Sequence, residues 1–180
     1  SPGYWRDPAE TTRAFDADGW FATGDVGRID EQGRLFITGR KREIIVLSNG
    51  RTLAPRPIET ALREEPLVSQ ALVYGERKDY ATALIALDPD ELARLAEDQS
   101  LSHLDPEALS RHPVVHARIS ALVQRVNQQL PPHAAIKQHP VLATGLSAEA
   151  GTLTPTQTLR RSRIAERYRS LIDSFYAESF

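Results

Sequence analysis

A tripeptide near the start of the chain carries the first group that could bind a ligand. Asp25 follows Thr23 and Gly24, and a carboxylate can accept hydrogen bonds from two adjacent ribose hydroxyls. Glycine allows the backbone to approach such a ligand closely, and each charge-assisted bond contributes about 1.5–3 kcal/mol. Taken alone, the tripeptide is more typical of an aspartate that caps a turn. A binding role for Asp25 therefore depends on the motifs around it.

Other reactive side chains are scarce. The chain has 19 arginines but three lysines, Lys41, Lys78 and Lys137, and it has no cysteine. The missing cysteine excludes disulfides, thiolate catalysis and cysteine-ligated metals. His112 and His116 are spaced like two metal ligands on a helix, but a proline lies between them and no carboxylate cluster completes a site. We therefore expect surface histidines and no metal site.

Composition and charge limit the possible partners. The 180 residues are 41% hydrophobic and 26% charged, as in a folded domain, and the net charge of −2 does not favour binding to nucleic acid. The arginine-rich stretch 160–169 has the spacing of an amphipathic helix with a solvated face. No apolar run approaches the roughly 20 residues that span a bilayer, and no signal peptide opens the chain. We expect a cytoplasmic protein without a nucleic-acid partner, and peripheral membrane contact stays open.

Two β-hairpins must position the candidate groups in the first third of the chain. A short helix is expected to end at Phe15, and strand-like runs lie on both sides of a turn at residues 30–33. Residues 44–47 form a second apolar run, followed by the pair Asn49-Gly50, which is typical of a type I′ hairpin turn.

Helices and strands alternate in the remainder of the chain. A short helix after Pro55 would have Glu59 in its first turn, where the helix dipole favours a negative charge. Residues 70–75 and 80–87 predict two strands joined by a charged turn at 76–79. Helices are expected near 90–98 and over 113–130, with a polar connection between them. One last helix carries an apolar stripe of Ile164, Tyr168, Leu171, Ile172 and Phe175.

Three separated stretches together resemble a known family. GWFATGDVGRID (19–30), GRKREIIVLSNGRTLAPRPIE (39–59) and GTLTPTQTLRR (151–161) occur in the order and spacing of the C-terminal part of adenylate-forming enzymes. Within that family the chain is most similar to long-chain fatty acyl-CoA synthetases, the AMP-binding ligases. The resemblance runs from Gly3 to the last helix, and its motifs are specific only in combination.

The resemblance implies a fold, a reaction and a division of the chain. The family has a large N-terminal domain that holds ATP, Mg²⁺ and the fatty acid, and a small C-terminal lid that closes over it. Residues 41–180 would be an α+β lid with a β-hairpin, a three-stranded sheet and flanking helices, and residues 1–40 the β-rich edge of the large domain. The parent would form an acyl-adenylate and then acyl-CoA. This chain lacks a phosphate-binding loop and is not expected to be an enzyme alone.

The resemblance also assigns roles at matching positions. Asp25 would bind ribose, and Arg40 would contact ribose or phosphate oxygens with its planar guanidinium. Arg42 lies where the family has its hinge, although Asp or Lys is more common there. Gly50 would leave room for the pantetheine arm of CoA, and Arg51 would meet a CoA phosphate. Without the resemblance, the arginines are solvated surface residues and the glycine is part of an ordinary turn.

The last motif departs from the family at the residue that carries its chemistry. The family pattern resembles Leu-Thr-Pro-Thr-x-Lys-Leu-Arg-Arg, and Thr158 stands at the lysine. That lysine bridges the substrate carboxylate and the α-phosphate, and losing one such group costs about 10²–10³ in rate. Arg160 and Arg161 match the family's own arginines, and Lys137 belongs to an expected strand. We therefore expect impaired adenylation, whether Thr158 is natural or engineered.

Two alternatives keep the resemblance and change the function. The acceptor could be the phosphopantetheine arm of a carrier protein, which only the large domain would reveal. The chain could also belong to a noncatalytic member that binds acyl groups, nucleotide or a protein partner. Loss of the lysine favours this second alternative, whereas the intact TGD and GRKR stretches oppose it.

Overall fold

The computed structural model describes residues 3–143, 146, 151–154 and 159–177. The chain divides into two compact units, residues 1–44 and residues 45–180, called here the N-terminal unit and the C-terminal unit. Each is described by itself. None of the helices in the described part of the chain is long and apolar enough to cross a membrane.

The N-terminal unit contains one short helix and one hairpin. Helix α1 (Pro8–Ala14) begins after Asp7, whose carboxylate accepts a hydrogen bond from the Glu10 amide, and Phe15, its predicted end, is the C-cap. Strands β1 (Asp25–Ile29) and β2 (Leu35–Arg40) pair in antiparallel fashion. The predicted hairpin is confirmed. A 3-10 turn, η1 (Lys41–Glu43), follows it directly.

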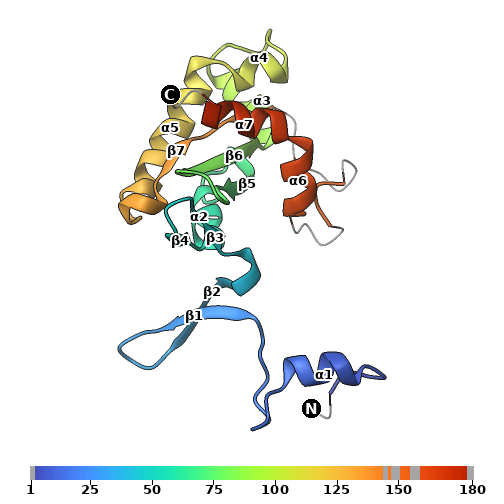
Figure 1. Ribbon diagram of the computed structural model, residues 1–180. Coiled ribbons are helices and arrows are strands. Elements are labelled where there is room, and N and C mark those ends of the chain that lie inside the picture. The colour runs from blue at the N-terminus through green and yellow to red at the C-terminus, as the bar shows by residue number, and fades with distance from the viewer. Residues whose placement is uncertain (1–2, 144–145, 147–150, 155–158, 178–180) are drawn as a thin grey trace. The chain divides into compact units, whose positions relative to one another are not determined.

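The C-terminal unit follows the predicted alternation of strands and helices (Figure 1). Its elements are β3 (Ile45–Val46), β4 (Thr52–Leu53), α2 (Pro55–Leu62), β5 (Val68–Tyr74), β6 (Ala81–Leu87), α3 (Pro89–Asp98), α4 (Pro106–Ser110), α5 (Pro113–Asn127), η2 (Pro132–Ala134), β7 (Ile136–Gln138), β8 (Val141–Leu142), α6 (Arg161–Arg167) and α7 (Arg169–Ala177). The α+β class is confirmed.

The main sheet has four strands, and two of them, β7 and β8, lie one after the other along the same edge of β6. β5 pairs antiparallel with β6, whereas β7 and β8 both pair parallel with β6 at successive points along it. His139 and Pro140 separate these two short strands. The expected third strand is thus interrupted at a proline, which has no amide hydrogen to donate. The Pro140 carbonyl still accepts a hydrogen bond from the Ile85 amide at 2.9 Å.

Both faces of β6 are covered, which explains its continuous apolar sequence. Alternate side chains of a strand point to opposite faces, and two separate clusters of buried residues use this alternation. The larger contains Ala83 and Ile85 with side chains from α2 and α5, and the smaller contains Leu84 and Ala86 with Ile164 of α6. A strand buried on both faces has no polar alternation for sequence analysis to detect.

Two expectations for the helices need correction. The polar connection before α5 contains a further helix, α4, which Asp105 caps by accepting a hydrogen bond from the Ala108 amide. The single C-terminal helix is two helices, because α6 ends at Arg167 and α7 begins at Arg169. The residue between them, Tyr168, has φ −104° and ψ 18°, outside the helical region.

Candidate functional site

The hairpin of the N-terminal unit brings Asp25 and Arg40 together. They are directly opposite each other in the register of β1 and β2, and the Arg40 Nε lies 2.9 Å from the Asp25 Oδ1. The Arg40 Nη1 also donates to the Thr23 carbonyl at 2.8 Å, and the Lys41 amide donates to the Gly24 carbonyl at 2.8 Å. The predicted tripeptide is therefore held against the end of β2.

This pair has the exposure that a ligand-binding group needs. The side chains of Asp25 and Arg40 keep 26% and 45% of their surface exposed. Gly24 has φ 72°, and an added Cβ would meet no atom within 4 Å. The backbone conformation rather than crowding therefore favours glycine. A carboxylate beside a guanidinium can accept hydroxyl donors on one side while the cation faces an anionic group.

Arg42 lies close to the division between the two units. It is the middle residue of η1, its side chain is exposed, and the N-terminal unit ends two positions later at Ile44. A charged side chain that stays in water imposes no packing constraint on a backbone that must rotate.

The second hairpin has a wider turn than the sequence predicts. Leu47 and Arg51 pair beyond the strands, because the Leu47 amide donates to the Arg51 carbonyl at 2.9 Å, and the Gly50 amide donates to the Leu47 carbonyl at 3.0 Å. Gly50 has φ 78°, whereas Asn49 is not among the described non-glycine residues with positive φ. A type I′ turn needs positive φ at both positions, so that prediction is wrong. The turn is a three-residue loop, 48–50, that ends in a left-handed glycine.

The charged turn between β5 and β6, residues 75–80, holds this loop in place. The Ser48 amide donates to the Lys78 carbonyl at 3.0 Å, and the Ser48 hydroxyl donates to the Asp79 Oδ1 at 2.5 Å. The Arg77 amide donates to the Val46 carbonyl at 2.8 Å, and the Val46 amide donates to the Glu76 carboxylate at 3.0 Å. Gly50 and Arg51 are thus exposed residues on a loop with a fixed base.

Glu59 has a structural role that differs from the expected one. It lies in the second turn of α2 and is 4% exposed, so the helix dipole does not account for it. Its carboxylate accepts a hydrogen bond from the Val73 amide at 2.8 Å and pairs with Arg161 at 2.5 Å. Burial raises the pKa of Glu59, and the Arg161 guanidinium opposes that shift. Arg161 therefore fastens α6 to α2 and β5.

Thr158 lies outside the described residues, but the segments that flank it are described. Leu153 and Leu159 form an antiparallel bridge, and the Arg160 amide donates to the Thr152 carbonyl at 2.8 Å. Leu153 is buried in the smaller cluster with Ile164. The described residues on the two sides of this segment are therefore paired with each other, and Leu153 anchors them to the sheet.

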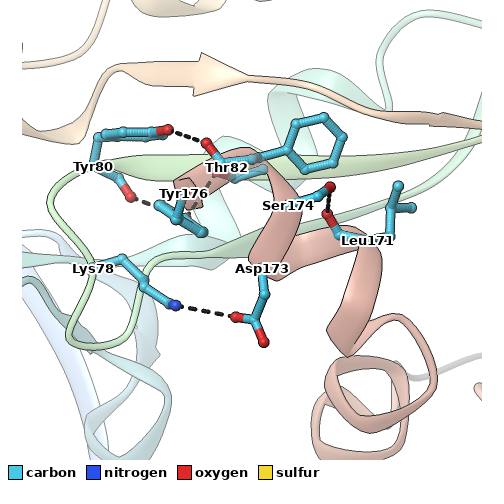
Figure 2. Close-up of polar contacts among 8 residues, drawn as sticks. Lys78, Tyr80, Thr82, Leu171, Asp173, Ser174 and Tyr176 are labelled. Atoms are coloured by element: carbon cyan, nitrogen blue, oxygen red, sulfur yellow. Dashed lines mark hydrogen bonds and ion pairs between the residues drawn. The ribbon is translucent and has the colours of Figure 1, made fainter. Parts of the chain in front are cut away.

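Sequence reasoning missed a group of polar contacts between the 75–80 turn and α7 (Figure 2). The Lys78 Nζ lies 3.1 Å from the Asp173 Oδ1, and the Tyr176 hydroxyl donates to the Tyr80 carbonyl at 3.1 Å. The Thr82 hydroxyl donates to the Tyr176 oxygen at 2.8 Å. These residues are 94 to 96 positions apart in sequence, and the tyrosines on the strand end and the last helix were the available signal.

Two of the five histidines take structural positions. His112 caps α5 by accepting the Val114 amide at its Nδ1, and His139 contacts the Ser120 hydroxyl at 3.0 Å. Burial, with the nearby His116, lowers the pKa of His139. Within the described ranges there is no group of three or more His, Cys, Asp or Glu that could hold a metal ion.

Comparison with known proteins identifies the family. The model of the AMP-binding enzyme C-terminal domain matches residues 42–179, and the chain belongs to this family. The long-chain-fatty-acid–CoA ligase FadD15 of Mycobacterium tuberculosis is 39% identical over 175 residues, 97% of this chain and 29% of that protein. The mouse long-chain-fatty-acid–CoA ligase ACSBG1 is 34% identical over 196 residues, 98% of this chain and 27% of that protein.

A solved structure agrees with the fold. The adenylation domain of a carboxylate reductase from Mycobacterium chelonae superposes with a TM-score of 0.76 at 27% identity, covering 98% of this chain and 26% of that one. The chain thus spans less than a third of the length of these relatives. The resemblance to AMP-binding ligases that the sequence indicated is confirmed.

Proposed function

We propose that this chain is the C-terminal lid of a long-chain fatty acyl-CoA synthetase, joined to the edge of the large AMP-binding domain. Residues 41–180 are the lid and residues 1–40 the edge. The start of the family match at residue 42 and the division of the structure after residue 44 support a boundary at this place. The names of the two ligase relatives support the substrate class.

The observation that carries the proposal is the pair formed by Asp25 and Arg40. Residues 15 positions apart meet at 2.9 Å, in half-exposed surroundings, beside a glycine with an open, left-handed backbone. In the proposed site the Asp25 carboxylate accepts the two ribose hydroxyls of AMP, and Arg40 contacts ribose or phosphate oxygens. Arg42, two residues after Arg40, is the hinge about which the lid turns between the two steps.

The reaction has two steps, and the proposal assigns this chain a different part in each. First a carboxylate oxygen of the fatty acid attacks the α-phosphorus of ATP, and pyrophosphate leaves. Then the sulfur of CoA attacks the acyl carbon, the thiol proton is lost, and AMP leaves. The exposed Gly50 loop lines the path of the pantetheine arm in the second step, and Arg51 meets a CoA phosphate. Mg²⁺ would be held by the large domain.

Thr158 makes the two steps unequal. A hydroxyl has no positive charge to offset the charge that develops at the α-phosphorus, which costs about 10²–10³ in rate. The second step needs no cation at this position, so it should proceed from preformed acyl-AMP. We therefore propose a synthetase whose adenylation step is weak.

The test is AMP binding by the full-length protein, compared between Asp25→Asn and Glu31→Gln. Both changes remove one negative charge from the same hairpin, but Glu31 lies exposed in the turn, away from Arg40. Loss of charge-assisted bonds to ribose predicts that Asp25→Asn weakens binding about tenfold or more. Isothermal calorimetry measures both constants.

Three other outcomes would contradict the proposal or change the acceptor. Equal affinity in both variants would contradict the role of Asp25. If the unaltered protein binds neither ATP nor AMP, the synthetase proposal fails and the noncatalytic alternative replaces it. If thioester forms on a carrier protein and not on CoA, the acceptor is the carrier's phosphopantetheine arm.

A further inference from the structure

The last helix and the Gly50 loop are attached to the same short turn. Residues 75–80 give backbone and carboxylate acceptors to Ser48, and they give Lys78 and Tyr80 to α7. Ser48 joins the 48–50 loop to this turn through two hydrogen bonds, one from its amide and one from its hydroxyl. The turn therefore contacts both α7 and the loop.

Single residues of the turn carry both attachments. The Lys78 carbonyl accepts the Ser48 amide at 3.0 Å while its ammonium lies 3.1 Å from the Asp173 carboxylate and 4.8 Å from the centre of the Tyr176 ring. Asp79, which accepts the Ser48 hydroxyl, is followed directly by Tyr80. Adjacent residues of one turn thus link the loop to the helix.

Two hydrogen bonds that run in opposite directions join Tyr80 to α7 (Figure 2). The Tyr80 hydroxyl donates to the Phe175 carbonyl at 2.5 Å, and the Tyr176 hydroxyl donates back to the Tyr80 carbonyl at 3.1 Å. The two rings lie 4.8 Å apart at their centroids. Burial raises the pKa of Tyr176 to about 12, so its hydroxyl keeps the proton that it donates. This reciprocal arrangement fixes the last turn of α7 against the start of β6.

The turn has little freedom to absorb a displacement. Arg77 adopts a left-handed φ of 57°. This conformation is costly for a residue with a side chain, so the surrounding contacts must hold it, among them the hydrogen bond from the Arg77 amide to the Val46 carbonyl. Gly75 lies so close to Leu47 that an added Cβ would come within 3.1 Å of the leucine side chain. Packing of this density transmits strain, so we expect the turn to move as one piece.

We propose that α7 is a latch that positions the 48–50 loop for the thioester-forming step, with Tyr176 and Lys78 as positioning residues. The CoA part of this inference rests on the proposed function. The mechanical part, that α7 sets the order of the loop, rests on the contacts alone. Neither residue touches substrate, and both act through the turn.

The test compares Tyr176→Phe and Asp173→Asn with Tyr168→Phe in the full-length protein. Tyr176→Phe removes the hydroxyl and keeps the ring, and Asp173→Asn weakens the Lys78 contact at a side chain that is 54% exposed, so the fold is retained. Tyr168→Phe is the matched control, because Tyr168 packs against the smaller cluster, whereas the contacts described between α7 and the 75–80 turn come from Asp173, Phe175 and Tyr176. Amide hydrogen exchange over residues 47–51 reports the order of the loop.

The latch predicts faster exchange at residues 47–51 in both variants and unchanged exchange in the control. It also predicts that the KM for CoA, with acyl-AMP supplied, rises about three- to tenfold, as expected from one lost hydrogen bond. ATP–pyrophosphate exchange should stay unchanged, which general destabilisation would not produce.

If amide hydrogen exchange at residues 47–51 is the same in the two variants as in the control, the latch proposal is overturned, whatever the activity. Faster exchange with an unchanged KM for CoA would overturn its role in the thioester step. Absence of thioester formation in the unaltered protein would refute the proposed function instead, while the exchange data would still decide whether α7 orders the loop.

Discussion

The two units of this chain hold their candidate residues by different means. In the N-terminal unit, Ala14 is the buried apolar residue among those described, while Trp5 and Trp20 are 86% and 76% exposed. The C-terminal unit buries apolar side chains on both faces of β6. Hairpin hydrogen bonds hold Asp25 against Arg40, whereas a packed core holds the base of the Gly50 loop.

This difference agrees with the proposed division of labour. An isolated two-stranded hairpin is marginally stable in water, and the first hairpin exposes Ile29, Leu35 and Ile37. A large domain that packs on these side chains would provide the core that the N-terminal unit lacks. The C-terminal unit has buried clusters of its own, as the proposed lid, which would move between two positions, requires.

The largest expected effect is a loss of core packing in the C-terminal unit. Leu122 is 1% exposed, and Leu122→Ala should lower the free energy of unfolding by about 3 kcal/mol through lost burial and the cavity left behind. Leu35 is 65% exposed, and Leu35→Ala should change the free energy of unfolding by no more than about 0.5 kcal/mol. Urea unfolding of the 180-residue chain measures both. Equal losses would show that the N-terminal unit has a core of its own.

Removal of Glu59 should cost slightly less. Glu59→Ala leaves the Arg161 guanidinium and the Val73 amide without their partner. We expect a loss of about 2–3 kcal/mol, since the arginine side chain is partly solvated. Glu107→Ala breaks an exposed pair with Arg111 and should cost no more than about 0.5 kcal/mol. Comparable losses would mean that the buried pair contributes no more than a surface pair.

Gly50 offers a smaller effect with a simple cause. Its φ of 78° is disfavoured for alanine, although there is open space around it. Gly50→Ala should therefore destabilise the chain by about 1 kcal/mol. Gly50→Asn should recover most of this loss, because asparagine tolerates the left-handed region. If both variants unfold at the urea concentration of the unaltered chain, the turn is not held in this conformation.

The smallest expected effect is a pH dependence at His139. Its folded-state pKa is lowered, mainly by burial, so the unfolded chain binds more protons as the pH falls below about 6.5. The contribution to stability is complete above a pH of about 6.5 and is lost as the pH falls toward the folded-state pKa. We expect about 1 kcal/mol or less between about pH 7.5 and about pH 5.5, and His139→Gln should remove it. A dependence that persists in the variant belongs to other groups.

Local patterns predicted the elements but not the contacts between distant ones. Turn residues and apolar runs located both hairpins, β5, β6 and α5, because these signals lie within a few positions. The break at Tyr168 has no glycine or proline to mark it, and the same apolar stripe suits one helix or two. The buried state of Glu59 depends on Arg161, 102 positions away, which no local pattern reveals.

Sequence analysis likewise predicted some features of the candidate site and not others. The turn residues predicted the hairpin but not its register, since the pairing of Asp25 with Arg40 includes a shift between Val26 and Gly27. The roles of Asp25 and Arg40 came from the family resemblance. The attachment of α7 to the 75–80 turn could not be predicted, since the interacting residues, such as Lys78 and Asp173, lie 95 or 96 positions apart. Sequence therefore located the loop that is proposed to admit CoA, and the structure added what holds it.

The central claim is that Thr158 weakens adenylation and spares thioester formation. The most direct test measures both steps in the full-length protein, with Thr158 and with Thr158→Lys. Fatty-acid-dependent ATP–pyrophosphate exchange should rise about 10²–10³-fold with lysine, while thioester formation from supplied acyl-AMP and CoA should occur in both. Rapid exchange in the unaltered protein, with no gain from lysine, would contradict the account.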